Sequence, residues 1–357
     1  KAFRSTRING FKSVKRSTTE EVILKNNNKI RNSVLGAAFI LGALSVAGTA
    51  LAEGDLTGKT VTLVTCGTSN PWCKVFNDQI VTGLEGAGVK VNMLENDFDA
   101  VLSVQQMNEA ISQKPDLIMV EPADDKALIG SVKKAKAAGV PVLYMDSPAD
   151  PAIEDDIAFQ VIADNHALGR FAGQNIIDGL RELGLKEANV IVISGTKGAK
   201  MVQDRQAGFE EVMATAPEYK IIDIQDGNWD PVLSGTIAQQ LFAKYQSQGG
   251  VQAVRAEADY TAIPVIQAAR QAGMKVGVKE GGLIVSGTNC TKAGIDAIRA
   301  GDMYGTATED AFTQGQYTLK AALQFLRGEK VEKTIIVPEY RVTKETLDQY
   351  AEVCSKG

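Results

Sequence analysis

The sequence predicts an α/β fold made of two doubly wound parallel-sheet lobes. From residue 58 onwards, short β-branched runs alternate with amphipathic helical stretches, a pattern typical of a parallel sheet with helices on both faces. Runs such as Leu117–Val120 are apolar throughout, as expected for strands that are buried on both faces. The alternation continues too long for one compact sheet, and no linker interrupts it. We therefore expect two lobes between which the chain crosses more than once.

The elements of the first series are predicted from β-branched or apolar runs for strands and from helical periodicity for helices. In order they are strand Thr60–Thr65, helix 74–86, strand Val89–Leu94, helix 101–112, strand Leu117–Glu121, helix 126–138 and strand Val142–Met145.

The same pattern then restarts and predicts a second series. In order it contains strand Ile157–Ile162, helix 167–183, strand Val190–Ser194, helix 200–215, strand Lys220–Gln225, helix 231–245, strand Val251–Ala256, helix 261–272 and strand Leu283–Gly287. The chain is completed by helix 292–300, strand Gly305–Thr308, the long helix 312–327 and a tail strand near 335–342.

An export signal is predicted at residues 33–52. Basic residues precede an apolar stretch that runs from Ser33 to Ala50, and Ala50-Leu51-Ala52 ends it with the small residues that a signal peptidase requires. Glycines dilute the stretch, which therefore differs from a membrane anchor of ~20 strongly apolar residues. We expect cleavage near Ala52, no lipid anchor, and a mature protein in the periplasm. Residues 1–52 are thus a leader; we hypothesise that Leu24 is a non-ATG start and that residues 1–23 are not native.

The composition limits the classes of partner. The first 52 residues hold 9 of the 38 basic and 2 of the 43 acidic residues. The mature chain therefore has 29 basic and 41 acidic residues and a formal net charge of −12. No basic patch remains, so nucleic acid is not expected as a partner. The acidic surface is compatible with a small neutral or cationic ligand.

Cysteine and histidine usage indicates neither a metal site nor a cofactor. The spacing of Cys66, Cys73, Cys290 and Cys354 matches no metal or redox motif. An oxidising compartment permits disulfides, but buried free thiols are equally compatible with the sequence. His166 is the only histidine, which gives little support to histidine-based chemistry.

Two tryptophans follow predicted strands in corresponding parts of the two series. Trp72 lies in Thr68-Ser69-Asn70-Pro71-Trp72, and Trp229 lies in Gly227-Asn228-Trp229-Asp230. A single loop tryptophan is as often a satellite of the core as a ligand contact. Two in equivalent settings favour a facing aromatic pair, because the apolar face of a sugar ring or polyol stacks on such rings.

Polar side chains also follow several predicted strands, at the edge where ligands bind in sheets of this kind. Each one alone is more simply explained as a solvated loop acid or a helix cap, but together they predict a binding cleft whose carboxylates accept hydrogen bonds from paired hydroxyls. The residues are Glu121, Asp146, Asn289 and Glu309.

A weaker indication comes from the start of helix 200–215. The preceding Gly195–Lys200 lacks the spacing of a phosphate-binding loop. Gln203 and Arg205 follow it, where a side chain can point into the cleft. The alternative for Arg205 is an ion pair with Asp204 or another neighbour.

With these residues in place, residues 58–345 resemble the periplasmic sugar-binding proteins of ribose-type ABC transporters, a type I periplasmic binding protein family. The order and spacing of several short segments carry the resemblance. They are Thr68–Trp72, Val120–Asp124, Met145–Ser147, Ile162–Asn165, Arg205–Phe209 and Gly328–Val331.

The resemblance implies two lobes joined by a three-stranded hinge that close over one sugar. The first lobe would comprise residues 53–162 and 310–337, and the second lobe residues 163–309 and 338–357. Carried over by position, the ligand-binding residues would be Asn70, Trp72, Glu121 and Asp146 in the first lobe, Gln203, Arg205, Trp229 and Asn289 in the second, and Glu309 at the hinge.

The chain also departs from the ribose-binding pattern. Ribose binders carry Arg at the positions of Ser147 and Gln203, Asn at those of Glu121 and Ala258, and Gln at that of Glu309. Having more acids and fewer arginines, the site suggests another pentose, a tetritol or pentitol, or an amino-bearing ligand.

The expected function is therefore solute capture and delivery to an ABC permease by a monomer that carries no cofactor and catalyses no reaction. A protein that presents the same ligand to a chemoreceptor or sensor kinase would use the same residues. An exported glycosidase could use Glu121 and Asp146 as paired acids. A Rossmann oxidoreductase is disfavoured because Thr65–Asn70 lacks the glycine fingerprint.

Overall fold

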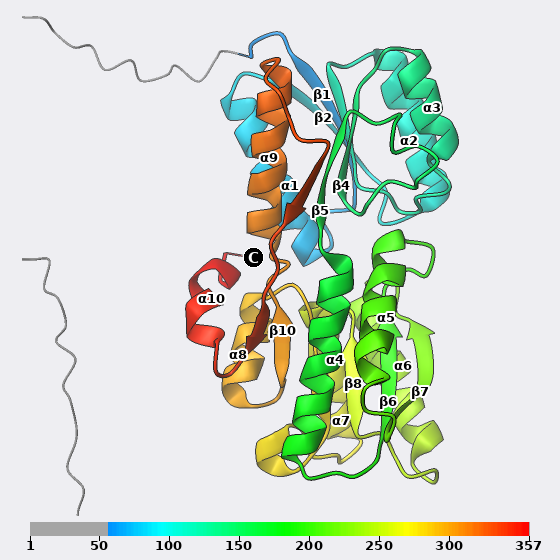
Figure 1. The fold of residues 1–357 in the computed structure, drawn as a ribbon, viewed down its shortest axis with the longest axis vertical. Helices are drawn as coiled ribbons and strands as arrows, with labels where there is room; N and C mark the ends of the chain where they lie inside the picture. Colours follow the sequence, from blue (N-terminus) through cyan, green and yellow to red (C-terminus); the bar gives the residue numbers. More distant parts are fainter. Residues whose placement is uncertain (1–55, 357) are drawn as a thin grey trace, which may run out of the picture. The chain divides into compact units, whose positions relative to one another are not determined.

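The computed structural model describes residues 56–356, and these form two α/β lobes with a parallel sheet in each, as the sequence predicts (Figure 1). The predicted export signal at 33–52 and residues 1–23 lie outside the described residues. Within residues 56–356, no helix is both long and apolar enough to span a bilayer.

The first lobe is built on a sheet with the strand order β2-β1-β3-β4-β5-β11, all paired in parallel. Helices α1 and α9 pack on one face, and α2 and α3 pack on the other (Figure 1). The strands are β1 Thr60–Thr65, β2 Lys90–Glu95, β3 Leu117–Val120, β4 Val142–Asp146, β5 Phe159–Ala163 and β11 Thr334–Val337. The helices are α1 Pro71–Gly86, α2 Ala100–Gln113, α3 Ile129–Ala137 and α9 Ala311–Leu326.

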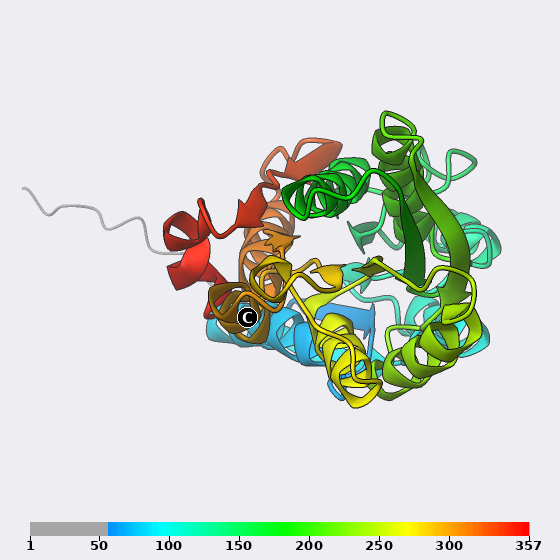
Figure 2. The ribbon, with the colours of Figure 1, turned by 90° about the horizontal axis from the view of Figure 1, so that it is seen from below.

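The second lobe repeats this order as β7-β6-β8-β9-β10, with β12 antiparallel to β10 at the edge. Its strands lie between α4 and α5 on one face and α6, α7 and α8 on the other (Figure 2). The strands are β6 Ala188–Ser194, β7 Tyr219–Asp226, β8 Ala253–Ala256, β9 Ile284–Ser286, β10 Gly305–Ala307 and β12 Arg341–Thr343. The helices are α4 Asn165–Glu182, α5 Lys200–Met213, α6 Pro231–Tyr245, α7 Asp259–Gln271, α8 Lys292–Ala300 and α10 Leu347–Cys354, with a 3-10 turn at Val278–Glu280.

The chain crosses between the two sheets three times: between β5 and α4, between β10 and α9, and between β11 and β12. The last crossing corrects one expectation. The predicted tail strand near 335–342 is two strands in different sheets, because Pro338, which has no amide hydrogen to donate, follows β11 directly.

Helices α4 and α5 pack unusually closely, and two glycines permit this approach. A Cβ atom at Gly169 would lie 1.9 Å from the carbonyl oxygen of Arg205, and one at Gly208 would lie 2.0 Å from that of His166. Any larger side chain would push the helices apart. Because α5 carries Arg205, this packing fixes the position of a charged group near the cleft.

Both cysteine pairs form disulfides, which settles a choice that the sequence left open. Cys66 is bonded to Cys73 within the first lobe, and Cys290 is bonded to Cys354. The second bond ties α10, a helix that the sequence reasoning missed, to the loop before α8.

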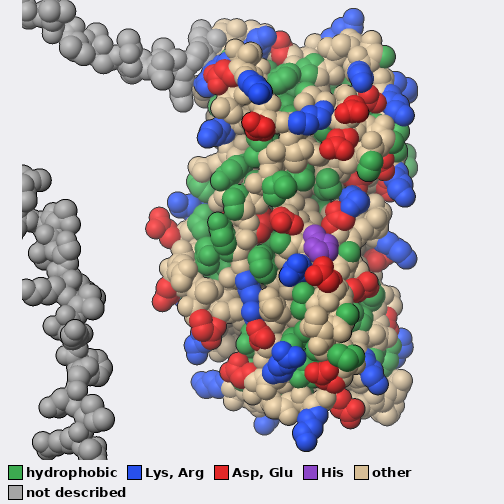
Figure 3. All heavy atoms as spheres, viewed as in Figure 1, with side chains coloured by type: hydrophobic (Ala, Val, Ile, Leu, Met, Phe, Trp, Pro, Cys, Tyr) green, Lys and Arg blue, Asp and Glu red, His purple; other side chains and the backbone are tan. Residues whose placement is uncertain are grey.

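The surface carries both signs of charge. Acidic and basic side chains are interspersed over the face shown in Figure 3, and basic groups do not gather there. His166 is nearly half exposed and its Nε2 lies 3.2 Å from a carboxylate oxygen of Glu211, so the single histidine belongs to a surface pair.

Candidate functional site

The site lies where the carboxyl ends of both sets of parallel strands meet. In each sheet the order in which strands are added reverses beside the first strand, between β1 and β3 in the first lobe and between β6 and β8 in the second. Open α/β sheets bind ligands at this switch point. A small cavity of about 20 Å³ lies there. Its lining residues come from both lobes: Trp72, Cys73, Phe98, Glu121, Asp146, Met201, Arg205, Trp229, Tyr260, Asn289 and Glu309.

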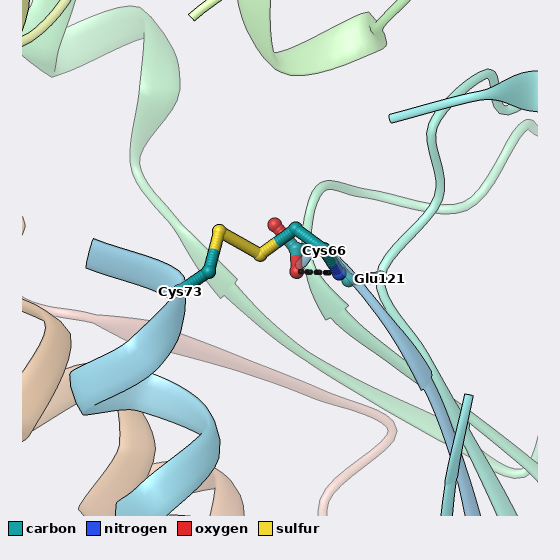
Figure 4. Close-up of side chains that lie close together, drawn as sticks. All are labelled: Cys66, Cys73 and Glu121. Carbon is teal, nitrogen blue, oxygen red and sulfur yellow. Dashed lines mark hydrogen bonds between the residues drawn. A yellow bond between two sulfur atoms is a disulfide. The ribbon is translucent and has the colours of Figure 1, made fainter. Parts of the chain in front are cut away.

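Glu121 follows β3 and forms part of the first-lobe wall. Its Oε2 accepts hydrogen bonds from Thr65 Oγ1 at 3.0 Å and from the amide of Cys66 at 3.3 Å, beside the Cys66–Cys73 disulfide (Figure 4). The carboxylate is 2% exposed. One oxygen is thus held by the protein, and no hydrogen bond to a described residue engages Oε1.

Asp146 ends β4 in a left-handed backbone conformation, with φ of 63°. Non-glycine residues seldom adopt this conformation, and such strain is concentrated at functional sites. The buried Oδ1 of Asp146 has no hydrogen-bond partner in the described part of the chain, and its carboxyl shares a hydrogen bond with Glu309. Asp146 therefore points an unsatisfied acceptor into a buried environment.

Arg205 joins the two carboxyl-bearing sides of the cavity. Its Nη2 lies 3.1 Å from Glu309 Oε2, and its Nε donates to Asn165 Oδ1 at 2.7 Å. Glu257 lies farther away, with Oε1 3.9 Å from Nη1, and Nη1 has no hydrogen-bond partner within residues 56–356. The alternative pairing with Asp204 is not what the structure shows, because Asp204 pairs with Lys200.

Asn289 approaches the same carboxylate from the loop after β9. Its Nδ2 donates a hydrogen bond to Glu309 Oε2, while its buried Oδ1 has no hydrogen-bond partner among the described residues. Glu309 lies between β10 and α9, and it thus accepts a hydrogen bond from Asn289 and forms an ion pair with Arg205, both of the second lobe. Its backbone continues into the first lobe.

Aromatic rings form the rest of the wall. Trp72 stacks on Phe76 at 4.8 Å between ring centroids and donates its Nε1 hydrogen to the carbonyl of Glu309 at 3.1 Å. Trp229 lies 6.0 Å from Phe98 of the opposite lobe, with the Arg205 guanidinium 5.5 Å from its ring. The ring nearest Trp229 is therefore Phe98 where the sequence led us to expect Trp72.

Burial dominates the electrostatics of the acids. Burial, reinforced by the charge of Asp146, raises the pKa of Glu121 to about 8. Burial also raises the pKa of Asp146, and that of Glu309 well above its ordinary value, although Arg205 opposes both shifts. With its pKa at about 8, Glu121 retains its proton near neutral pH.

Seven of the nine residues that the sequence predicts line this cavity. They are Trp72, Glu121, Asp146, Arg205, Trp229, Asn289 and Glu309.

Asn70 lies just outside the cavity and has two structural contacts. Its Oδ1 caps α1 by accepting from the amides of Trp72 and Cys73, and its Nδ2 donates to the Tyr260 hydroxyl of the other lobe at 3.0 Å. Asn70 thus orients Trp72 and Tyr260, two residues that line the cavity.

Gln203 is not brought to the cavity. It is exposed, and its amide contacts the carbonyls of Lys197 and Gly198 beside a separate groove. Successive helical residues turn by ~100°, so a residue two positions before Arg205 faces away from it, whereas Met201, four positions before, shares its face.

Sequence reasoning missed four lining residues: Cys73, Phe98, Met201 and Tyr260. Phe98 and Tyr260 follow β2 and β8, so the strand-end argument could have found them. Met201 could not be predicted from a strand end, because its position in the cavity depends on which face of α5 points inward.

One cluster has the spacing of metal ligands. Among the described residues, Cys66, Cys73 and Glu121 bring ligand atoms within 4.8 Å of one another. The two sulfur atoms are bonded to each other, so neither is available as a thiolate, the form that binds metal.

Comparison with known proteins identifies a matching family and several relatives of this chain. A family model described as the periplasmic binding protein domain matches residues 61–330. The ribose import binding protein of Haemophilus influenzae is 25% identical over 305 residues, which are 85% of this chain and 96% of that protein. The xylitol-binding protein of Mycolicibacterium smegmatis is 25% identical over 325 residues, which are 88% of this chain and 87% of that protein.

Solved structures share the fold. A galactofuranose binding protein superposes with a TM-score of 0.75 at 22% identity, covering 82% of this chain and 97% of that one. The binding component of an arabinose ABC transporter from Shewanella sp. ANA-3 gives a TM-score of 0.74 at 23% identity, covering 83% and 95%.

Proposed function

This chain belongs to the periplasmic binding protein domain family, and we propose from that premise that it captures one small sugar or polyol between its lobes and delivers it to an ABC permease. Members of the family are binding proteins, so the chain is not an enzyme.

The observation that carries the proposal is a set of unpaired, buried polar atoms around one cavity. Among the described residues, Trp229 Nε1 and Arg205 Nη1 are donors without hydrogen-bond acceptors, and Asp146 Oδ1 and Asn289 Oδ1 are acceptors without donors. Burying such atoms unpaired costs free energy. A hydroxyl group both donates and accepts, so a polyhydroxylated molecule satisfies both kinds of atom at once.

The aromatic rings agree with this ligand class. Trp229, Phe98 and Tyr260 offer apolar faces next to the polar atoms, which suits the alternating CH and OH surfaces of a sugar.

Relatives that are named for ribose and xylitol support the same class. Glu121 and Glu309 replace amides of the ribose-binding pattern, which favours a ligand other than ribose: another pentose, a tetritol or pentitol, or an amino-bearing sugar.

Ligand capture would follow from differential affinity. Because the lining residues come from both lobes, a ligand that contacts Glu121 and Arg205 together stabilises the closed arrangement more than the open one. Closure about the three crossings would then present a distinct surface to the permease. We also propose export by the segment at 33–52, cleavage near Ala52, action as a monomer in the periplasm, and transport as the role in preference to presentation to a chemoreceptor.

A thermal-shift screen of residues 53–357 tests the proposal. The panel contains pentoses, hexoses, tetritols, pentitols, amino sugars and a furanose signal molecule. A ligand with micromolar Kd at millimolar concentration adds ~4 kcal/mol to the free energy of unfolding. We expect one chemical group of the panel to stabilise the protein. No stabilisation by any member, after unfolding and refolding to remove a bound molecule, would contradict the proposal.

A further inference from the structure

Helix α5 begins without a cap from its own lobe. Its N-cap residue is Ala199, which has no side-chain oxygen to accept from the first-turn amides. Several other described helices begin with a side chain that does so: Asn70 for α1, Asp99 for α2, Asp164 for α4, Asp230 for α6, Thr291 for α8 and Asp310 for α9.

The missing acceptor comes from the opposite lobe. Asp125 lies in the loop after β3, and its Oδ2 accepts a hydrogen bond from the amide of Lys200, the first residue of α5, at 2.6 Å. Ser147, which follows β4, donates to the other oxygen at 3.2 Å. Asp125 is 4% exposed, so the contact is made in a buried environment.

The neighbouring backbone is shaped for this approach. A Cβ atom at Gly198 would lie 2.6 Å from Asp124 Oδ2 and 3.8 Å from Asp124 Cβ. A larger residue at 198 would fit only if the Asp124 carboxylate moved aside. The two loops therefore fit together at Asp124–Asp125 and Gly198–Lys200.

We propose that Asp125 is a positioning residue that caps α5 only when the lobes close, and so sets how strongly closure is favoured and where Arg205 stands in the site. Arg205 and Met201 both project from α5 into the cavity. A helix N-terminus carries partial positive charge, so an aspartate placed there is stabilising. When the lobes separate, α5 loses its cap and Asp125 returns to water.

The charges around Asp125 are compatible with this role. Burial raises the pKa of Asp125 to about 7, against the effect of the Lys200 amide and Ser147, and Asp124 adds a smaller increase. On the packed elements, Tyr144 interacts electrostatically with Asp125, while the side chains of Lys200 and Asp204 pair with each other. The Lys200 backbone rather than its ammonium group is thus the direct partner.

Disulfide trapping measures closure without any sugar. Cysteines at 124 and 198 would place their Cβ atoms 3.8 Å apart in the closed state, which is within the ~3.5–4.5 Å range of a disulfide. Asp124→Cys with Gly198→Cys forms the background, and its trapping rate, normalised for thiol reactivity, reports the closed population. Peptide mapping under non-reducing conditions identifies the new bond and excludes exchange with the native pairs.

In this background we expect Asp125→Ala to slow trapping ~5- to 10-fold, the equivalent of one lost cap of ~1–1.4 kcal/mol. Asp125→Asn, which keeps a capping oxygen, should restore most of the rate. Asp150→Ala is the matched control, because Asp150 accepts from the Ala152 amide within the first lobe only, and it should trap at the parent rate.

Two results would overturn the proposal. One is equal trapping in the Asp125→Ala and parent proteins. The other is an Asp125→Asn protein that traps as slowly as Asp125→Ala, which would mean that the carboxylate acts through charge or loop folding and not as a cap. Thermal unfolding of the reduced variants shows whether each is folded. Because no ligand is added, the outcome is independent of the proposed sugar or polyol.

Discussion

Arg205 and Glu309 form a buried ion pair, with Nη2 and Oε2 3.1 Å apart and both side chains at most 2% exposed. The pair joins helix α5 of the second lobe to the segment that crosses back to α9 of the first. Asn165 and Asn289 complete it by hydrogen bonds to Arg205 and Glu309. The binding cavity is thus held together by groups that would also be costly to leave unpaired.

Replacing Arg205 alone should therefore destabilise the protein strongly. Arg205→Met leaves Glu309 buried without its cation, and breaking such a pair costs ~3–5 kcal/mol. Denaturant unfolding of the ligand-free protein at pH 7 measures the loss. The double variant Arg205→Met with Glu309→Gln should lose less than the two single variants together. Strict additivity would mean that the two side chains do not interact energetically.

Glu121 should make the ligand-free protein less stable as pH rises. Its pKa is raised from 4.5 to about 8 by burial, so its contribution is complete below pH 4.5 and is lost as pH rises through about 8. Each such group contributes a slope of up to ~1.4 kcal/mol per pH unit. Glu121→Gln should flatten the dependence of unfolding free energy on pH between 5 and 8. The exposed Glu85→Gln should leave it unchanged, and equal slopes in all three proteins would refute the prediction.

Trp229 should contribute a stacking face. It is 7% exposed and lies between Phe98 and Arg205 at the cavity wall. Trp229→Ala should weaken binding of the strongest panel member by ~1–3 kcal/mol in calorimetry, the scale for burying a large apolar side chain. Trp229→Phe should recover part of the loss. Tyr317→Ala, at an exposed position on α9, should have no effect. Unaltered affinity of Trp229→Ala would remove this ring from the site.

The two disulfides should differ in how much they contribute to the free energy of unfolding. Cys290–Cys354 closes a loop with a sequence separation of 64, and Cys66–Cys73 one of 7. In the chain-entropy model these loops correspond to ~4 and ~2.5 kcal/mol. Replacing each pair by alanines and measuring denaturant unfolding should show the larger loss for the long loop. A larger loss for Cys66–Cys73 would instead indicate that its contact with Glu121 dominates.

Much of the fold could be predicted because the strands are buried on both faces. The run Leu117–Val120 is apolar at every position, which leaves no other location for it than the centre of a sheet. The tail was harder: the sequence predicts one strand near 335–342, whereas the crossing between the lobes divides this segment into β11 and β12. Helix α10 has eight residues and is tied down by a cysteine 64 positions away, a relationship that no local pattern contains.

The sequence identifies residues that line the cavity where their placement depends on strand ends, and it does not identify them reliably where the placement depends on helix rotation. Glu121 follows β3 directly and Asp146 ends the neighbouring strand β4, so parallel pairing brings them together. Gln203 and Arg205 differ by two positions on α5, and the sheet-facing side of that helix decides which one enters the cavity. The contact of Asp125 could not be predicted, because its partner Lys200 belongs to the opposite lobe. The residues around a single strand end give no information about that lobe.

The most direct test of the central claim is a crystal structure of residues 53–357 with the panel member that stabilises the protein most. The account predicts one molecule between the lobes, with hydrogen bonds to Glu121, Asp146 and Arg205 and a face against Trp229. A molecule bound instead in the separate groove beside Gln203, with the central cavity unchanged, would contradict it.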